Sequence, residues 1–255
     1  MRRRKITLNT HGPGIIDGRQ IRAAAFVPAR EQLLDRILQE RADLAHGSRR
    51  ALVIGAGYSP LPSALRDRGF QTTAIDPSAE ATAIAQAHTP QVDFRTASAS
   101  GLKVEPASFD LVYCTDTLEV DDNLDGVLAA VEKAARPGAV VILDTVTDTA
   151  IAKLIYLLVF QRLWFTSIVP PGRYSSDRLR NPLELEEACR RAGLAVDTVI
   201  GFEPKSVGSL VQGLLKRRSG RITDEELAVL AGFHLSKANH APLVTYFAVA
   251  TKNRF

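Results

Sequence analysis

The chain has 255 residues, of which 45% are hydrophobic and 24% are charged. This is the composition of a folded protein with a full core, and it excludes an intrinsically disordered chain. The formal net charge is +4, and a basic stretch at residues 2–5 contributes to it; we expect this stretch to be solvated and expect no nucleic-acid partner.

Cysteine content and apolar stretches limit which metal sites, disulfides and cellular locations can be expected. Cys114 and Cys189 are too few for a disulfide framework or a cysteine metal cluster, so we expect no metal. The basic start is not followed by the apolar region of a signal peptide. The longest apolar stretch, residues 151–169, is barely long enough to cross a bilayer and carries charged residues in its interior. We therefore expect a cytoplasmic protein.

The first part of the chain, residues 1–47, is predicted to form an N-terminal helical cap. Turn signals over residues 11–18 predict irregular chain up to about Ala29. From Pro28, leucine and isoleucine recur at helical spacing as far as Gly47, which predicts one helix.

Strands and helices then alternate. Residues 50–57 are apolar from Ala51 onward and end in a glycine turn, as in a parallel strand that is covered on both faces. Further strands are predicted over 70–76, 92–97, 109–114 and 139–146, and helices over 61–68, 79–87 and 124–135, the last closed by Arg136-Pro137-Gly138. Alternation at this spacing predicts an α/β fold with a doubly wound, Rossmann-like and mostly parallel sheet.

Residues 148–182 interrupt this rhythm with an apolar helix and a turn at Pro170-Pro171-Gly172, and we interpret them as a helical lid inserted into one domain that spans 1–255. A helix over 183–192 and strands over 195–202 and 243–252 complete the prediction.

A candidate ligand site lies at the ends of the first two strands. Gly55-Ala56-Gly57 lets the backbone approach a ligand closely, and the helix that follows offers unpaired N–H groups. Asp76 ends the next strand, where a carboxylate accepts two ribose hydroxyls or caps the helix near Ala79. Together the two features favour a nucleoside ligand. A dinucleotide-binding loop needs glycine at position 60, where this chain has Pro60, and this disfavours NAD and FAD.

The ordered motifs resemble one family. They are ALVIGAG (51–57), TTAID (72–76), FRTASASGL (94–102), FDLVYCTDTLEV (109–120) and ARPGAVVILDT (135–145). This set is similar to that of the class I S-adenosylmethionine-dependent methyltransferases, whose last strand, matched here by TYFAVATK (245–252), lies antiparallel beside the fifth. The turn at 170–174 and the helix after it are similar to those of the ubiquinone-biosynthesis O-methyltransferases.

The resemblance implies S-adenosylmethionine as the cofactor and assigns its contacts. Gly55, Ala56 and Gly57 would line the methionine portion and Asp76 the ribose hydroxyls. The remaining contacts would be Pro77, Ala97 and Ser98 at the adenine and Thr115 and Asp116 at the methionine. The chain departs from the family at Ser59, where a third glycine is usual, and after the third strand, where a carboxylate is often found. Glu119-Val120 also replaces a common Glu-His pair.

Methyl transfer depends mainly on alignment of the reacting groups, but an oxygen acceptor must also lose its proton. The candidate bases are His240, His234, His11, Asp144 and Glu119. We favour His240, because it precedes the last strand, and Asp144. A surface or packing role is the more common one for each histidine.

The apolar segment 151–169 has two interpretations. It is a lid packed on the sheet edge or a homodimer contact, or else it forms a hydrophobic acceptor pocket or a helix resting on a membrane. Under the second interpretation Trp164, Arg173 and Tyr174 contact the acceptor, although Arg173 and Tyr174 equally suit a turn cap.

The expected function is methyl transfer to a small aromatic or lipophilic acceptor, most readily at a hydroxyl oxygen. Two alternatives remain. The first is a methyltransferase-like protein that acts as a cyclase or as a non-catalytic partner, and the second is a nicotinamide-dependent oxidoreductase.

Overall fold

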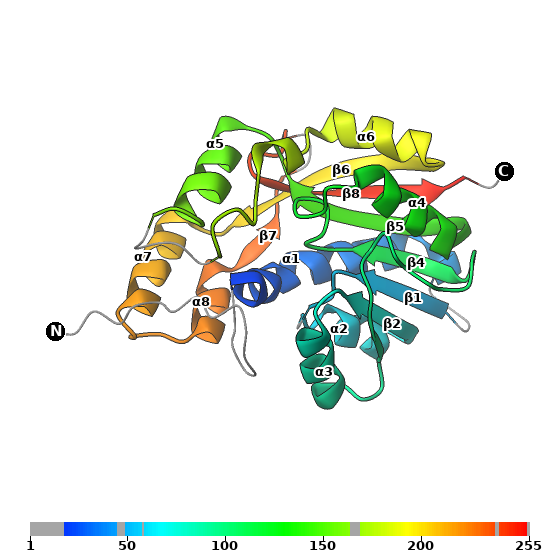
Figure 1. Cartoon of the computed structure of the whole chain (residues 1–255), viewed down its shortest axis with the longest axis horizontal. Coiled ribbons are helices and arrows are strands. Elements are labelled where there is room, and N and C mark those ends of the chain that lie inside the picture. Colours follow the sequence, from blue (N-terminus) through cyan, green and yellow to red (C-terminus); the bar gives the residue numbers. More distant parts are fainter. Residues whose placement is uncertain (1–17, 45–48, 58, 164–168, 238–239, 254–255) are drawn as a thin grey trace.

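The computed structural model describes residues 18–44, 49–57, 59–163, 169–237 and 240–253. An eight-stranded sheet runs through the molecule in the order β3-β2-β1-β4-β5-β8-β6-β7 (Figure 1). The strands are β1 (Arg49–Ile54), β2 (Phe70–Asp76), β3 (Asp93–Thr96), β4 (Phe109–Cys114), β5 (Ala135–Val146), β6 (Leu194–Pro204), β7 (Phe233–Leu235) and β8 (Thr245–Lys252). The helices are α1 (Gly18–Glu40), α2 (Leu61–Asp67), α3 (Ala79–His88), α4 (Leu124–Ala134), α5 (Ala150–Lys153), α6 (Pro182–Arg191), α7 (Val207–Arg218) and α8 (Asp224–Ala231), with shorter turns η1 (Ala42–Leu44), η2 (Leu154–Val159) and η3 (Ser176–Arg178).

The sheet has the predicted topology. Strands β1 to β5 pair in parallel, and β8 lies antiparallel between β5 and β6, which confirms the prediction for the last strand. The strand order reverses between β1 and β4, because β2 lies on one side of β1 and β4 on the other. In open α/β sheets, ligands bind outside the carboxyl ends of the strands at such a reversal.

Two apolar cores cover the two faces of the sheet. Side chains alternate along β1, so that Ala51 and Val53 pack with α1 and α2, and Leu52 and Ile54 pack with α4 and α6. The same helices lie on opposite sides of the sheet in Figure 1. Burial on both faces explains why these strands are apolar without interruption.

Helix α1 corrects the prediction for the N-terminal region. It begins at Gly18, ten residues before Pro28, where irregular chain was expected, and Pro28 lies inside it. Proline removes one backbone hydrogen bond of a helix and clashes with the preceding turn. Burial of Phe26, Ala29 and Leu33 in the core outweighs that cost.

The tripeptide Arg136-Pro137-Gly138 does not end a helix in a separate turn, as predicted, but lies inside β5. The pairing of β4 with β5 shifts register between Phe109 and Leu111 at this point. The irregularity accommodates the proline, which has no N–H for the strand ladder.

The chain after β5 holds elements that the sequence prediction missed. Helix α5 and the π-helix η2 that continues it correspond to the predicted apolar helix, whereas α7, α8 and β7 follow β6 where no element was predicted. Figure 1 shows α5, α7 and α8 gathered beyond one end of the sheet. Within the described ranges, none of the helices is both long and apolar enough to span a membrane.

Candidate functional site

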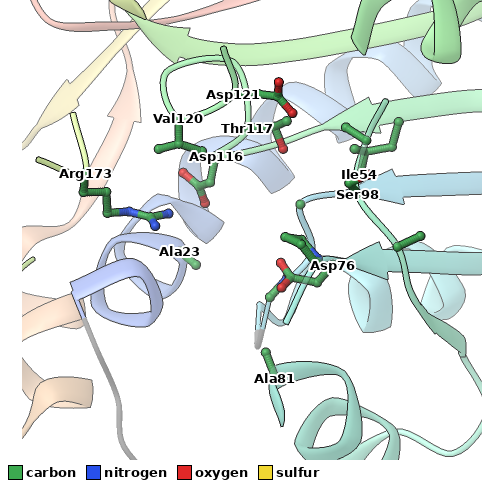
Figure 2. A pocket seen from close by; sticks show the side chains of 15 residues that line it. Ala23, Ile54, Asp76, Ala81, Ser98, Asp116, Thr117, Val120, Asp121 and Arg173 are labelled. Carbon is green, nitrogen blue, oxygen red and sulfur yellow. The ribbon is translucent and has the colours of Figure 1, made fainter. Parts of the chain in front are cut away.

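A cavity of about 230 Å³ lies where β1, β2, β3 and β4 end and where α1 passes (Figure 2). Among its lining residues are seven of the predicted cofactor contacts, Gly55, Gly57, Asp76, Pro77, Ala97, Ser98 and Asp116. The topology brings these residues together because parallel strands present their carboxyl ends at one edge of the sheet.

Gly55 and Gly57 are glycines for different structural reasons. A Cβ on Gly55 would lie 2.1 Å from the carbonyl oxygen of Thr115, so only glycine lets the end of β1 meet the end of β4. Gly57 has a φ of +51°, and a Cβ there would be 3.7 Å from Asp76 Oδ2, an ordinary contact. Gly57 is therefore retained for its backbone conformation, which is costly for other residues.

Asp76 holds the loop after β1 and the loop after β2. Its Oδ2 accepts a hydrogen bond of 2.9 Å from the N–H of Gly57, and its Oδ1 accepts one of 2.8 Å from the N–H of Ser78, the N-cap of α3. The carboxylate thus fixes the turn before α3 and also lines the cavity, into which it points in Figure 2. The cap interpretation and the ligand interpretation are both compatible with this position.

The other predicted cofactor residues divide into lining and supporting groups. Ala97 and Ser98 follow β3, and the Ser98 hydroxyl accepts a hydrogen bond of 3.1 Å from the N–H of Gly101. Ala56 and Thr115 are fully buried behind the cavity. The Thr115 hydroxyl donates to the Gly55 carbonyl at 3.0 Å, which ties the two strand ends together.

Asp116 lines the cavity and belongs to a buried ionic cluster. Its φ is +47°, and its N–H donates to Asp144 Oδ1 at 3.0 Å. Its carboxylate lies 2.9 Å from Arg22 Nη2 and 2.9 Å from Arg30 Nη2. Burial alone would raise the pKa of Asp116, but the two guanidinium groups hold it below its usual value.

Asp144 lies behind this cluster. Its side chain has no exposed surface, and Arg30 Nε donates to its Oδ2 at 2.8 Å. Burial raises its pKa to about 6, against the attraction of Arg30. The carboxylate is fully buried and does not line the cavity, which speaks against the predicted role of Asp144 as a base. It positions Arg30 and Asp116 instead.

None of the candidate histidines within the described ranges lines the cavity. His240 is exposed in the chain before β8, which speaks against the favoured prediction of a base, and His234 lies in β7. His11 lies outside the described residues. Glu119 is fully buried, is paired with Arg22 and accepts a hydrogen bond of 3.4 Å from Thr145.

Of the predicted acceptor residues, Arg173 lies across the cavity from Asp76 (Figure 2). Arg173 lines the cavity, and Figure 2 shows its guanidinium and the carboxylate of Asp116 directed toward one another. Its Nε is buried without a hydrogen-bond partner among the described residues. Tyr174 is buried, and its hydroxyl accepts a hydrogen bond of 2.9 Å from Arg22 Nη1. Trp164 lies outside the described residues.

Sequence reasoning missed Arg22 and Arg30, which hold this cluster together. Both are at most 6% exposed, and they lie on the buried face of α1 with Phe26 between them at helical spacing. Arginines at core positions of a helical pattern were a usable signal. It was lost because the segment before Ala29 was predicted to be irregular.

Within the part of the chain that the structure describes, no cluster of three or more His, Cys, Asp or Glu side chains could hold a metal ion. Among the described residues, Asp116 Oδ1 is ion-paired with Arg22 but accepts no hydrogen bond, and Arg173 Nε has no hydrogen-bond partner. A carboxylate and a guanidinium at one cavity suit an organic ligand that carries both charges. The methionine portion of S-adenosylmethionine is such a zwitterion, so the residues present fit this cofactor.

Comparisons with known proteins indicate the same family as the motifs. The model of a methyltransferase domain matches residues 26–199. The ubiquinone biosynthesis O-methyltransferase of Paracidovorax citrulli is 32% identical over 161 residues, which cover 61% of this chain and 67% of that protein. The enzyme of the same name from Pseudomonas aeruginosa strain LESB58 is 31% identical over 170 residues, which cover 65% and 72%.

Solved structures share the fold. An S-adenosylmethionine-dependent methyltransferase from Mesorhizobium loti superposes with a TM-score of 0.57 at 18% identity, over 91% of this chain and 100% of that one. The 4+2 cyclase SpnF superposes with a TM-score of 0.55 at 17% identity, over 88% and 80%. The chain therefore belongs to the methyltransferase domain family, within the class I S-adenosylmethionine-dependent methyltransferases that its motifs resemble.

Proposed function

We propose that the protein transfers the methyl group of S-adenosylmethionine to a hydroxyl oxygen of a small aromatic or lipophilic molecule. The observation that carries this proposal is the cavity at the strand reversal, lined by Gly55, Gly57, Asp76 and Asp116. The similarity to ubiquinone biosynthesis O-methyltransferases supports oxygen as the accepting atom.

Different cavity residues bind different parts of the cofactor in this proposal. Asp76 accepts the ribose hydroxyls, and its carboxylate is already oriented by the N–H groups of Gly57 and Ser78. Asp116 pairs with the ammonium and Arg173 with the carboxylate of the methionine portion. Pro77, Ala97 and Ser98 lie beside the adenine. The cofactor supplies an electrophilic methyl group on a sulfonium leaving group, so the chain contributes mainly alignment and exclusion of water.

Residues 148–182 act as the lid of this site. Gln161 Oε1 accepts the N–H of Tyr174 at 2.9 Å, and Gln161 Nε2 donates to the Tyr174 carbonyl at 3.1 Å. This pair joins the end of η2 to the turn that carries Arg173, which lines the cavity.

The test combines binding with transfer. Asp76→Ala is expected to weaken S-adenosylhomocysteine binding at least about 100-fold in calorimetry, because two charge-assisted hydrogen bonds are lost. Asp93→Ala changes an exposed carboxylate of β3 and should leave that affinity within about twofold. Radiolabel transfer from S-adenosylmethionine to substituted phenols then tests the acceptor class. Unchanged binding by Asp76→Ala would refute the ribose assignment.

A second candidate is a cyclase-like protein that binds the cofactor without methyl transfer. It is favoured by one observation, that no described histidine lines the cavity to serve as a base. Tight binding of S-adenosylhomocysteine together with no transfer to any phenol would support it. The nicotinamide alternative is not retained, since the family model is that of a methyltransferase domain.

A further inference from the structure

Two walls of the cofactor cavity come from segments that are distant in the chain. The loop after β4 contributes Asp116, Thr117 and Val120, and the turn of the lid contributes Arg173 (Figure 2). In the proposed function, Asp116 binds the ammonium and Arg173 the carboxylate of the methionine portion. Both contacts form at once only if the two walls are held at a suitable distance from one another.

Arg178, in η3, bridges these two walls, although it does not line the cavity itself. Its Nη1 donates a hydrogen bond of 2.7 Å to the carbonyl oxygen of Val120. Its Nε donates one of 2.6 Å to the hydroxyl oxygen of Ser175, two residues after Arg173. A guanidinium presents its N–H groups in a rigid fork, so one side chain fixes both partners in a single geometry.

Both ends of this bridge lie next to well-packed chain. Val120 packs against the buried apolar cluster of the lid, which includes Tyr174 and Leu179. The backbone of Tyr174 is held in turn by the side-chain amide of Gln161. Arg178 also lies 3.6 Å from Asp122, but that carboxylate is 87% exposed and adds little. The hydrogen bonds to Val120 and Ser175 therefore carry the link between the walls.

We infer that Arg178 is a positioning residue that sets the distance between Asp116 and Arg173 for the amino-acid portion of the cofactor. Contacts that are placed before binding lower the cost of ordering them when the ligand arrives. A ligand that reaches only the ribose and adenine contacts does not need the two walls at a fixed distance. The bridge therefore favours ligands with an amino-acid portion. This inference rests on the proposed function, from which it takes the placement of the cofactor.

The test compares S-adenosylhomocysteine with 5′-methylthioadenosine, which has the same nucleoside and a thioether but no amino-acid portion. In calorimetry, Arg178→Met is expected to weaken S-adenosylhomocysteine binding at least about tenfold, because the charge-assisted hydrogen bonds of the bridge are lost. The affinity for 5′-methylthioadenosine should change less than about twofold. Equal weakening of both ligands would assign Arg178 a general structural role and overturn the inference, as would unchanged binding of both.

Arg191 provides a matched control on the neighbouring helix α6. It is 59% exposed and lies 3.4 Å from Asp125, so Arg191→Met removes an arginine ion pair away from the cavity. We expect both affinities to change less than about twofold in this variant. A selective loss of S-adenosylhomocysteine binding in Arg191→Met would overturn the assignment to Arg178.

A conservative variant covers the case in which Arg178→Met no longer folds. Arg178→Lys keeps the positive charge but replaces the planar fork with a single ammonium group, which does not bridge the two oxygen atoms in the same geometry. The loss should again be selective, at least about threefold for S-adenosylhomocysteine and less than about twofold for 5′-methylthioadenosine. Wild-type affinities for both ligands in Arg178→Lys would contradict the bridging role.

A double variant tests whether Arg178 acts through Arg173. In an Arg173→Met background, Arg178→Met should weaken S-adenosylhomocysteine binding less than about twofold further, because the contact that it positions is already gone. A full tenfold loss in that background would refute the positioning role. Failure of the wild-type protein to bind S-adenosylhomocysteine would refute the proposed function and this inference with it. Tight wild-type binding without a selective loss in the Arg178 variants would refute this inference alone.

Discussion

The cofactor end of the molecule and the apolar end are built in different ways. The cofactor cavity is formed by four short loops that each follow a strand, and polar contacts such as that of Asp76 with Gly57 hold those loops. A second, apolar cavity is formed by α1, η2, α7 and α8, which are distant in the sequence and meet through side-chain packing.

This difference shows which kind of site a short sequence motif can predict and which kind depends on tertiary packing. A strand-end loop carries its function in a few neighbouring residues, so a motif describes it. The apolar cavity has no motif, because any combination of large apolar side chains of suitable volume builds it. The ionic cluster of Arg22, Arg30, Asp116 and Asp144 joins the two ends. Variants in the cofactor end, the cluster and the apolar end are expected to change the free energy of unfolding by different amounts.

The largest effect is expected at Gly55. Gly55→Ala places a Cβ 2.1 Å from a backbone oxygen at a φ of +73°, and we expect a loss of about 5 kcal/mol in the free energy of unfolding in urea. Gly172 in the lid has a φ of +84° but nothing within 4 Å of its Cβ position. Gly172→Ala should therefore cost only about 1 kcal/mol. Similar costs at both sites would contradict the close approach of β1 and β4.

The next effect concerns the cluster between the two ends. Arg30→Met leaves Asp144 without a buried cation and leaves Asp116 paired with Arg22 alone, and we expect a loss of about 4 kcal/mol in the same assay. Arg36→Met, on the same helix, breaks only an exposed pair with Glu40 and should cost less than about 0.5 kcal/mol. A small effect of Arg30→Met would show that the cluster does not hold α1 on the sheet.

A smaller effect on the free energy of unfolding is expected from the titration of Asp144. The pKa of Asp144 is about 6 in the folded protein, above the usual value of 3.8, so the folded state binds more protons between these values. Stability should therefore fall as pH rises from 4 to 6, by up to about 1.4 kcal/mol per pH unit. The lowered pKa of Asp116 acts in the opposite direction, because stability then falls as pH drops toward and below its usual value of 3.8.

The variant Asp144→Asn should remove this component. The difference between its unfolding free energy and that of the wild type, measured in urea at several pH values, should change between pH 4 and 6 and be flat above pH 7. A constant difference across the whole range would mean that Asp144 is ionised throughout.

The smallest effect lies at the apolar end. Thr223 caps α8, where its hydroxyl accepts the N–H of Glu226 at 3.2 Å and the Glu226 carboxylate accepts the N–H of Thr223 at 2.7 Å. Thr223→Ala should lower the free energy of unfolding by about 1 kcal/mol, whereas Thr223→Ser keeps the cap and should be nearly neutral. Equal losses would assign the effect to the threonine methyl group.

Some of what the prediction missed was present in the sequence. Thr223 and Glu226 have the spacing of a capping box, which would have indicated α8. The start of α1 was hidden by Pro28, which local rules interpret as a helix start, although burial of Phe26 and Ala29 continues the helix on both sides of it. The structure speaks against the role predicted for Asp144, because Arg30 of the distant helix α1 covers its carboxylate, and the strand sequence does not show that partner.

The antiparallel last strand was predicted from the family resemblance. The amino-acid sequence by itself determined the alternation of strands and helices and the loop residues Gly55, Gly57 and Asp76 that line the first cavity. This alternation and these loops depend on neighbours in the chain, and local sterics and periodicity specify them. Only the tertiary structure decided that Arg22 and Arg30 hold Asp116, that Asp144 is sealed, and that distant helices enclose an apolar cavity. Those features depend on desolvation and packing between segments far apart in the chain, which no local pattern encodes.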